Sequence, residues 1–129
     1  MNSATMLLLI ALALFQIKHF LCDFVFQSLW QVNNKGTYGH VAGVVHAGLH
    51  VLGSVPALLV LTQSPAAIAA LCLGEFVIHY HMDWGRAQID TRFGLTEKDQ
   101  AYWVLFGADQ FVHQLTYLGM IAVLEAGLL

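Results

Sequence analysis

The chain has 129 residues, of which 58% are hydrophobic and 10% are charged, and its formal net charge is −3 at pH 7. This length suits one domain, and soluble domains carry about 25% charged residues. The composition therefore excludes a soluble helical bundle and predicts an integral membrane protein. Because the sequence has no basic patch with interleaved aromatic residues, we expect no nucleic-acid partner.

Apolar stretches separated by turn residues predict an all-α, four-transmembrane-helix bundle that takes in residues 1–129 as one membrane domain. Each stretch holds about 20 residues or more, as a hydrocarbon core about 30 Å thick requires. The residues before the first stretch include no Lys or Arg, and no clear cleavage site follows, so we expect no removable signal peptide. The expected helices cover about residues 4–30, 38–61, 65–85 and 97–125.

Capping and breaking residues set these boundaries. Pro56 lies inside the second helix and is expected to kink it. Ser64 followed by Pro65 is typical of a helix start, and Trp84-Gly85 is expected to end that helix. Thr96 with Asp99 three residues later resembles a capping box at the start of the fourth helix.

The basic residues indicate the topology. They lie in the loops after the first and third expected helices, at Lys35 and at Arg86, Arg92 and Lys98. The positive-inside rule places both loops in the cytoplasm. Both termini are therefore expected on the same, non-cytoplasmic side.

Ionisable side chains recur at four-residue spacing inside the apolar stretches, and this spacing places each row on one face of its helix. At about 1.5 Å per residue, all four rows fall in the cytoplasmic half of the bilayer. Ionisable groups at this depth are costly without partners, so we expect the rows to meet in one site. The rows are His19, Asp23 and Gln27; His46 and His50; Glu75, His79 and Asp83; and Asp109 and His113.

Imidazole and carboxylate groups are the usual ligands of zinc, manganese and non-haem iron. Four ionised carboxylates are untenable in a low-dielectric slab, and one or two divalent cations, helped by Lys18 or Arg86, would neutralise them. We expect Asp109 or Glu75 to act as general base. The predicted metal ligands are His19, Asp23, His46, His50, His79, Asp83, Asp109 and His113.

Several other residues have structural interpretations. His40 lies at a helix end and His81 lies off its row, so both are expected to make hydrogen bonds between helices. Asp83 has an alternative role as a helix cap paired with Arg86. Cys22 and Cys72 are interpreted as small buried side chains. A small-residue row at Gly39, Gly43 and Ala47 indicates close helix packing.

Polar motifs follow one another in a recognisable order along nearly the whole chain: His19-x3-Asp23-x3-Gln27, Trp30, Lys35, His46, His79-x3-Asp83-x2-Arg86 and Asp109-Gln110-x2-His113. This order resembles a family of small bacterial and phage multi-pass membrane proteins, catalogued as a domain of unknown function (number 3307). Arg86 stands where the family pattern has lysine, which keeps the charge but changes the geometry. The resemblance implies a multi-pass protein of the bacterial inner membrane. It implies no particular reaction, because the family has no established activity.

We expect an integral membrane metalloprotein, with zinc as the first candidate and iron or manganese as alternatives. A metal-activated water would hydrolyse a membrane lipid or a membrane-embedded substrate. The alternatives are a di-iron oxidase or hydroxylase, a proton or metal transporter, and a structural accessory subunit. The acidic groups argue against haem. Since four helices make a thin bundle, a homodimer is a further expectation.

Overall fold

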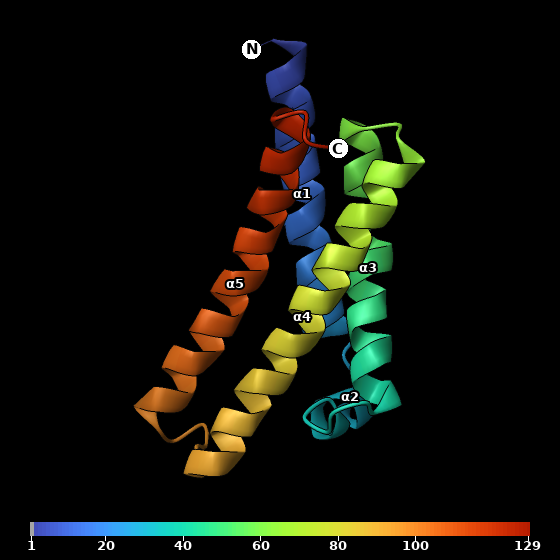
Figure 1. The fold of residues 1–129 in the computed structure, drawn as a ribbon. Coiled ribbons are helices and arrows are strands. Elements are labelled where there is room, and N and C mark those ends of the chain that lie inside the picture. Colours follow the sequence, from blue (N-terminus) through green and yellow to red (C-terminus); the bar gives the residue numbers. More distant parts are fainter. Residues whose placement is uncertain (1) are drawn as a thin grey trace.

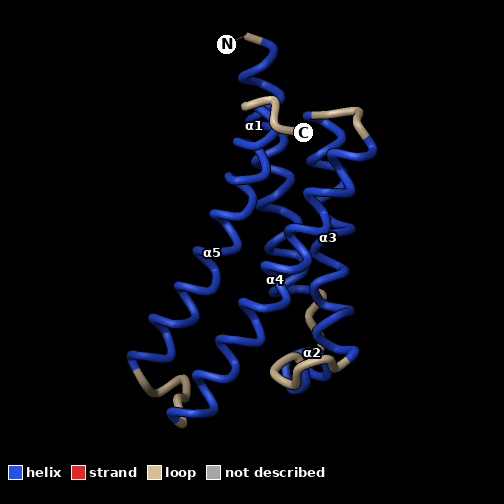
Figure 2. Tube along the Cα trace, viewed as in Figure 1, coloured by secondary structure: helices blue, strands red, loops and turns tan. Residues whose placement is uncertain are grey.

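The computed structural model describes residues 2–129, which fold into helices without β-strands. The long helices lie side by side, and both termini and the α3–α4 turn lie at one end of the bundle (Figure 1). The short helix α2 and the α4–α5 loop lie at the other end (Figure 2). The prediction of an all-α fold is confirmed. The elements are α1 (Ser3–Phe20), a π-helical turn η1 (Leu21–Val25), α2 (Leu29–Asn34), α3 (Val41–Leu61), α4 (Pro65–Phe93) and α5 (Gln100–Glu125).

Three helical segments within residues 2–129 are long and apolar enough to cross a membrane: Ser3–Val25, Val41–Leu61 and Pro65–Phe93. Many large apolar side chains on these segments face outward, including Leu52 and Leu73, which are 69% and 65% exposed. An apolar exterior of this kind suits lipid rather than water. The α5 helix has 26 residues but interrupts its apolar stretch with side chains such as Asp109 and His113.

The first expected helix is not continuous to residue 30. The N–H of Phe26 donates to the carbonyl of Leu21 at 2.7 Å, which is the i→i+5 bond of a π-helix. The chain then starts again at α2, where Ser28 and Gln31 form a capping box. The prediction of one helix over about 4–30 was therefore wrong in its last turns.

Two further boundaries differ from the sequence prediction. The α4 helix continues past Gly85 to Phe93 and ends at Gly94, whose φ of 61° is left-handed. The α5 helix begins after Asp99, at Gln100, and not after Thr96 at residue 97. The Asp99 carboxylate instead accepts hydrogen bonds from the Thr96 backbone and hydroxyl, which lower the pKa of Asp99.

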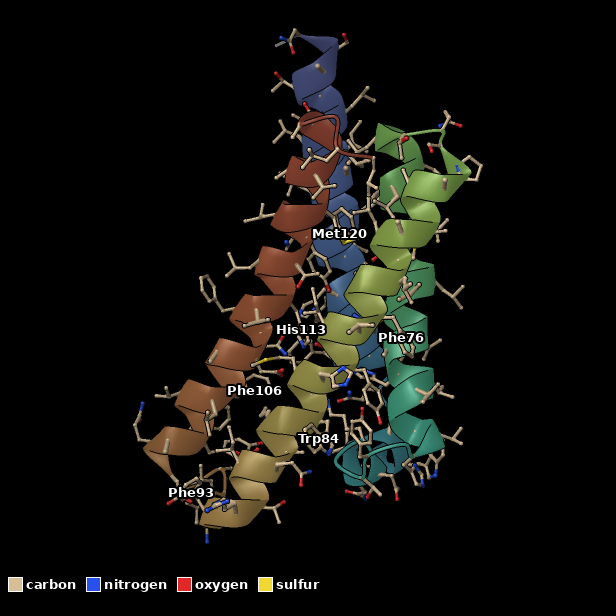
Figure 3. The ribbon with its side chains drawn as sticks, viewed as in Figure 1. Phe76, Trp84, Phe93, Phe106, His113 and Met120 are labelled. Carbon is tan, nitrogen blue, oxygen red and sulfur yellow. The ribbon has the colours of Figure 1, made fainter. Side chains whose placement is uncertain are left out.

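The apolar core lies in the half of the bundle nearer the termini. It consists of Phe15, Ala57, Leu58, Leu71, Tyr117 and Met120, and the rings of Phe15 and Tyr117 stack with centroids 5.0 Å apart. Met120 and His113 both lie on the side of α5 that faces the other helices (Figure 3). The core therefore closes one end of the interior, and polar side chains occupy the space beyond it.

Two of the three small residues predicted to pack closely, Gly43 and Ala47, do so on α3. Gly39 lies before α3 with a φ of 77°, and a Cβ added there would meet nothing within 4 Å, so its part of the prediction was wrong. A Cβ added at Gly43 would lie 3.0 Å from Cε2 of Tyr80 on α4, and Ala47 is fully buried. Close approach of α3 to its neighbours shortens the reach of its histidines toward α4.

Candidate metal centre

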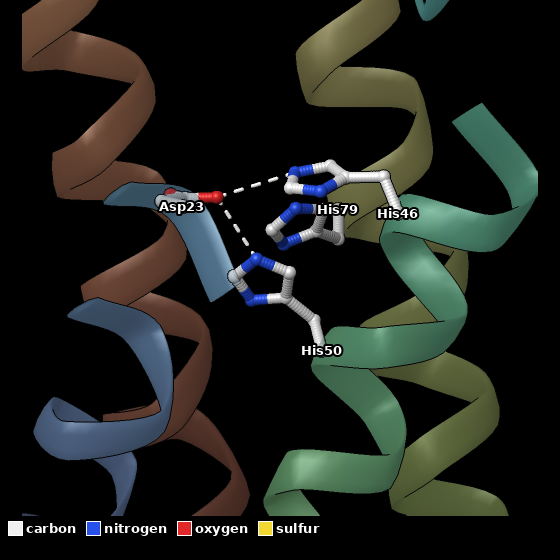
Figure 4. A group of neighbouring side chains, drawn as sticks. All are labelled: Asp23, His46, His50 and His79. Carbon is white, nitrogen blue, oxygen red and sulfur yellow. Dashed lines mark hydrogen bonds and ion pairs between the residues drawn. The ribbon is translucent and has the colours of Figure 1, made fainter. Parts of the chain in front are cut away.

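Side chains from four segments converge in the polar half of the interior. Figure 4 shows Asp23 of η1 facing His46 and His50 of α3, with His79 of α4 beside them. The three histidines are at most 1% exposed. We call the full set the His/Asp cluster: Asp23, His46, His50, His79, Asp83, Asp109 and His113.

Four of these residues have ligand atoms close enough to hold one ion. Asp23 Oδ1 lies 2.9 Å from His50 Nε2 and 3.2 Å from His46 Nε2. With His79, these groups offer one nitrogen or oxygen each, all within 4.8 Å of one another. One carboxylate and three imidazoles match the donor set of a zinc or non-haem iron site.

A second set overlaps the first. His79, Asp83 and His113 also offer ligand atoms within 4.8 Å of one another. Asp83 Oδ2 lies 3.2 Å from His46 Nε2 and 3.6 Å from His79 Nε2, whereas Asp83 Oδ1 lies 3.6 Å from His113 Nε2. One carboxylate oxygen of Asp83 therefore faces His46 and His79, and the other faces His113.

Some buried donor and acceptor atoms in the His/Asp cluster have no hydrogen-bond partner among residues 2–129. The clearest case is Nε2 of His79, which lies 3.6 Å from Asp83 Oδ2. Nε2 of His113 and Oδ1 of Asp109, by contrast, lie 3.2 Å from each other as an ion pair. The His79 and His113 rings also stack with centroids 3.9 Å apart. Buried polar atoms are rarely left unpaired in folded proteins, so Nε2 of His79 is free to bind a further group such as a metal ion.

The π-helical turn explains how Asp23 reaches the histidines. An α-helix carries 3.6 residues per turn, and a π-turn takes up an additional residue, which shifts the following side chains around the axis. Asp23 lies in the middle of this turn. The helix then breaks, and Gln27 places its amide nitrogen 3.0 Å from His46 Nε2. Single-turn π-helices are frequent at functional sites.

An outer group of side chains holds Asp23 in place. His19 Nε2 lies 2.7 Å from Gln110 Oε1, and His19 Nδ1 lies 3.0 Å from the Tyr117 hydroxyl. A neutral imidazole satisfies both contacts when Nε2 donates to Gln110 and Nδ1 accepts from Tyr117. The Gln110 amide also donates to Asp23 Oδ2 at 3.3 Å. Such outer contacts fix the orientation of metal ligands.

The charges of the interior are almost paired. Lys18 forms a buried ion pair with Glu75, and Lys35 lies 3.2 Å from Asp83. Arg86 pairs with Asp90, 3.4 Å away, and not with the His/Asp cluster. The three aspartates of the cluster against the one ammonium of Lys35 leave −2 when the histidines are neutral, which is the charge that one divalent cation cancels.

The structure brings most of the sequence-predicted site residues together. Three lie outside the two ligand sets. The two ring nitrogens of His19 are both in hydrogen bonds, Glu75 pairs with Lys18, and Asp109, predicted as a metal ligand, instead contacts the ligand His113. His40 caps α3, and His81 contacts the Tyr38 hydroxyl at 3.1 Å, so both lie outside the cluster.

Sequence reasoning missed two residues that touch the cluster or its outer group. Lys35 was predicted as a loop residue and as part of the family motif order but not as part of the site, although it reaches Asp83. Tyr117 was not selected, although it lies four residues after His113 and continues that row along α5. Extending the row by one turn would have found Tyr117, whereas no spacing rule connects Lys35 with Asp83.

A model of one protein family, described as "Protein of unknown function (DUF3307)", matches residues 8–127. No curated protein and no solved structure matches the chain. The matched range contains every residue of the His/Asp cluster and of its outer group.

Proposed function

We propose a function for this chain, which belongs to the DUF3307 family of proteins of unknown function, from the chemistry of its His/Asp cluster. The match over residues 8–127 confirms the family expected from the order of the polar motifs. We propose that the protein is an integral membrane metalloprotein that binds a divalent cation and uses it for hydrolysis.

In this proposal, α5 is the fourth membrane span, and the protein resides in the bacterial inner membrane. Lys35 directly follows α2, Arg86 and Arg92 lie in the distal part of α4, and Lys98 lies in the α4–α5 loop. That end of the bundle faces the cytoplasm if the positive-inside rule holds, and the termini then face the opposite side. A homodimer, suggested by the thin bundle, is testable by cross-linking in membranes.

We assign the cation to Asp23, His46, His50 and His79, with Asp83 and His113 completing the site on its other side. The observation that carries this assignment is the buried Nε2 of His79, which has no hydrogen-bond partner among residues 2–129 and belongs to a residue shared by both ligand sets. Zinc is the first candidate because it accepts mixed imidazole and carboxylate ligands. Iron and manganese accept the same ligands and are the alternatives.

When bound, zinc would lower the pKa of a water ligand to about 7 and so supply a hydroxide nucleophile. Asp109 is the residue placed to accept a proton, because its buried Oδ1 lies 3.2 Å from Nε2 of His113, at the edge of the second ligand set. His19 and Gln110 orient Asp23. Since the cluster lies between membrane-length helices, the substrate class is a lipid or a membrane-embedded ester or amide.

Proton transfer is a second candidate because the cluster alternates acids and bases. Asp109, His113, Asp83, His46 and Asp23 follow one another with nitrogen-to-oxygen distances of 3.2, 3.6, 3.2 and 3.2 Å. Chains of this kind serve as proton relays in membranes. The apolar core around Phe15 and Leu58 lies across any continuation toward the termini, which disfavours a path through the whole bundle.

Elemental analysis tests the metal proposal. The protein is purified in detergent without added metal, and the moles of each metal per chain are compared with those of His79→Ala and of the matched control His81→Ala. About one zinc per chain in the native protein and in the control, but not in His79→Ala, would support the proposal. Absence of metal from all three, even after reconstitution with zinc, would overturn it.

Activity measurements separate the remaining functions. Zinc-dependent cleavage of a fluorogenic fatty-acyl ester in mixed micelles, lost in Asp109→Asn with zinc retained, supports the hydrolase. Iron with visible absorption after aerobic purification identifies the di-iron alternative. Proton flux in liposomes identifies the relay. Bound zinc that changes only thermal stability identifies a structural metal.

A further inference from the structure

A groove with a volume of about 430 Å³ lies between α4 and α5, outside the His/Asp cluster. Its size falls within the range of about 300–1,000 Å³ that is usual for small-molecule sites. Its walls are mainly apolar, with Gly74 and Ile78 on α4 and Val112 and Gly119 on α5 among the lining residues. Ile78 and Val112 directly precede His79 and His113 in the sequence, so one end of the groove adjoins the cluster.

One buried carboxylate lines this apolar groove. Glu75 is 1% exposed, and its Oε1 accepts a hydrogen bond from Lys18. Its Oε2 is buried and has no hydrogen-bond partner among residues 2–129. The other polar side chain on the wall, Thr116, already donates to the carbonyl of Val112. The groove therefore presents one unmet acceptor, which is costly to bury alone.

The chemistry of this acceptor defines the ligand. An ionised carboxylate only accepts hydrogen bonds, so the ligand must bring a donor. The ion pair of Lys18 with Glu75 has no net charge, so a charged headgroup gains no counter-charge here and loses its hydration. An uncharged hydroxyl meets Oε2 at a smaller desolvation cost.

We propose that the groove binds a long-chain alcohol from the bilayer, with its hydroxyl donating to Glu75 and its alkyl chain along α4 and α5. The chain would lie against Leu71 and Ile78 on one wall and Leu115 and Met120 on the other. Binding of the alcohol requires no metal. If the groove binds no alcohol, the proposal of a metal centre at the His/Asp cluster is unaffected.

Photo-cross-linking locates the ligand. A 1-dodecanol probe with a diazirine near its methyl end is added to the protein in phosphatidylcholine nanodiscs, irradiated, and mapped by peptide mass spectrometry. Labels are expected within residues 70–78 and 112–123, which contain the groove wall. Labels spread evenly over the lipid-facing surfaces of all the long helices would overturn the proposal.

Glycine substitutions provide matched variants. A Cβ added at Gly74, Gly119 or Gly107 would meet no heavy atom within 4 Å, and Leu is a better helix former than Gly. Only Gly74 and Gly119 line the groove. Gly74→Leu and Gly119→Leu should therefore remove most of the labelling, whereas Gly107→Leu should retain it. Equal labelling of the three variants would overturn the groove as the site.

Competition on the native protein tests the hydrogen bond itself. Dodecyl methyl ether has the same alkyl chain and an oxygen at the same position as 1-dodecanol, but it lacks the hydroxyl hydrogen and so cannot donate a hydrogen bond. The alcohol should displace the probe at about fivefold lower concentration, the factor expected from one net hydrogen bond. Equal competition by both compounds would overturn the assignment of Glu75 Oε2 as the acceptor.

Discussion

Lys18 and Glu75 form an ion pair in the bundle interior, where they are 5% and 1% exposed. The Lys18 ammonium also donates to the carbonyl of His50 at 3.2 Å and lies 4.3 Å from the ring centroid of Tyr117. The pair thus ties α1 to α4 beside the histidines of α3. Two opposite charges at this depth are tolerable only because each neutralises the other.

Removing one member of this pair should destabilise the protein strongly. Lys18→Met leaves the Glu75 carboxylate buried without a counter-charge, and the expected loss is about 3–5 kcal/mol of unfolding free energy. The double variant Lys18→Met with Glu75→Met should recover most of this loss. Unfolding in detergent micelles measures both variants, and a double variant as unstable as the single one would contradict the interpretation.

Tyr117 should affect metal affinity without touching the metal. Tyr117→Phe keeps the ring that stacks on Phe15 but removes the hydroxyl contact to His19. Since outer contacts of metal ligands affect affinity about 10–100-fold, a more distant contact should cost about tenfold, measured by competition with a zinc chelator. Tyr80→Phe is the control, because its hydroxyl accepts from the Gly39 backbone. Equal zinc affinities of the two variants would refute the role given to Tyr117.

Close packing of α3 against α4 should make Gly43 sensitive to substitution. The Cβ of Gly43→Ala would lie 3.0 Å from the Tyr80 ring, and overpacking of this kind costs about 1–3 kcal/mol. Gly48→Ala on the same helix meets nothing within 4 Å and should gain about 0.5–1 kcal/mol from helix propensity. Thermal unfolding of the two variants should therefore shift in opposite directions, and shifts of the same sign would contradict this packing.

Metal removal should lower stability by the amount that binding contributes. At a free zinc concentration 100 times the Kd, binding to the folded state adds about 2.7 kcal/mol. Chelation should therefore lower the unfolding temperature, and zinc should restore it. Magnesium serves as the control, because it prefers oxygen ligands. A native protein whose unfolding temperature responds to neither chelator nor zinc would speak against a metal linked to folding.

The convergence of the polar rows could be predicted from spacing because a helix brings every fourth residue to one face. His46 with His50, and His79 with Asp83, behave in this way and meet inside the bundle. Glu75 belongs to the same row by spacing, yet it turns to Lys18. Spacing determines which residues share one face of a helix. It does not determine which side chain of a neighbouring helix lies opposite each of them, and this decides the partner of Glu75.

The helix boundaries show a different limit. The polar segment after Gly85 has the composition of a loop, but α4 continues through it because its side chains bond along the helix. Arg86 and Asp90, four residues apart on α4, form an ion pair with a distance of 3.4 Å. Ion pairs of this spacing stabilise polar helical segments, and apolar periodicity does not detect them.

The π-helical turn that carries Asp23 implies a specific sensitivity to chain length. A π-turn accommodates one residue more than the α-helical turn it replaces. Deleting Cys22 would let the hydrogen bonds revert to the α pattern. The residues after the turn would keep their orientation, but Asp23 would move back by one position, up to about 100° around the axis. The aspartate would then swing away from the imidazoles while the helix itself stayed intact. Related chains that lack this one extra residue should also lack the acid at this position, so the two features are expected to be gained or lost together.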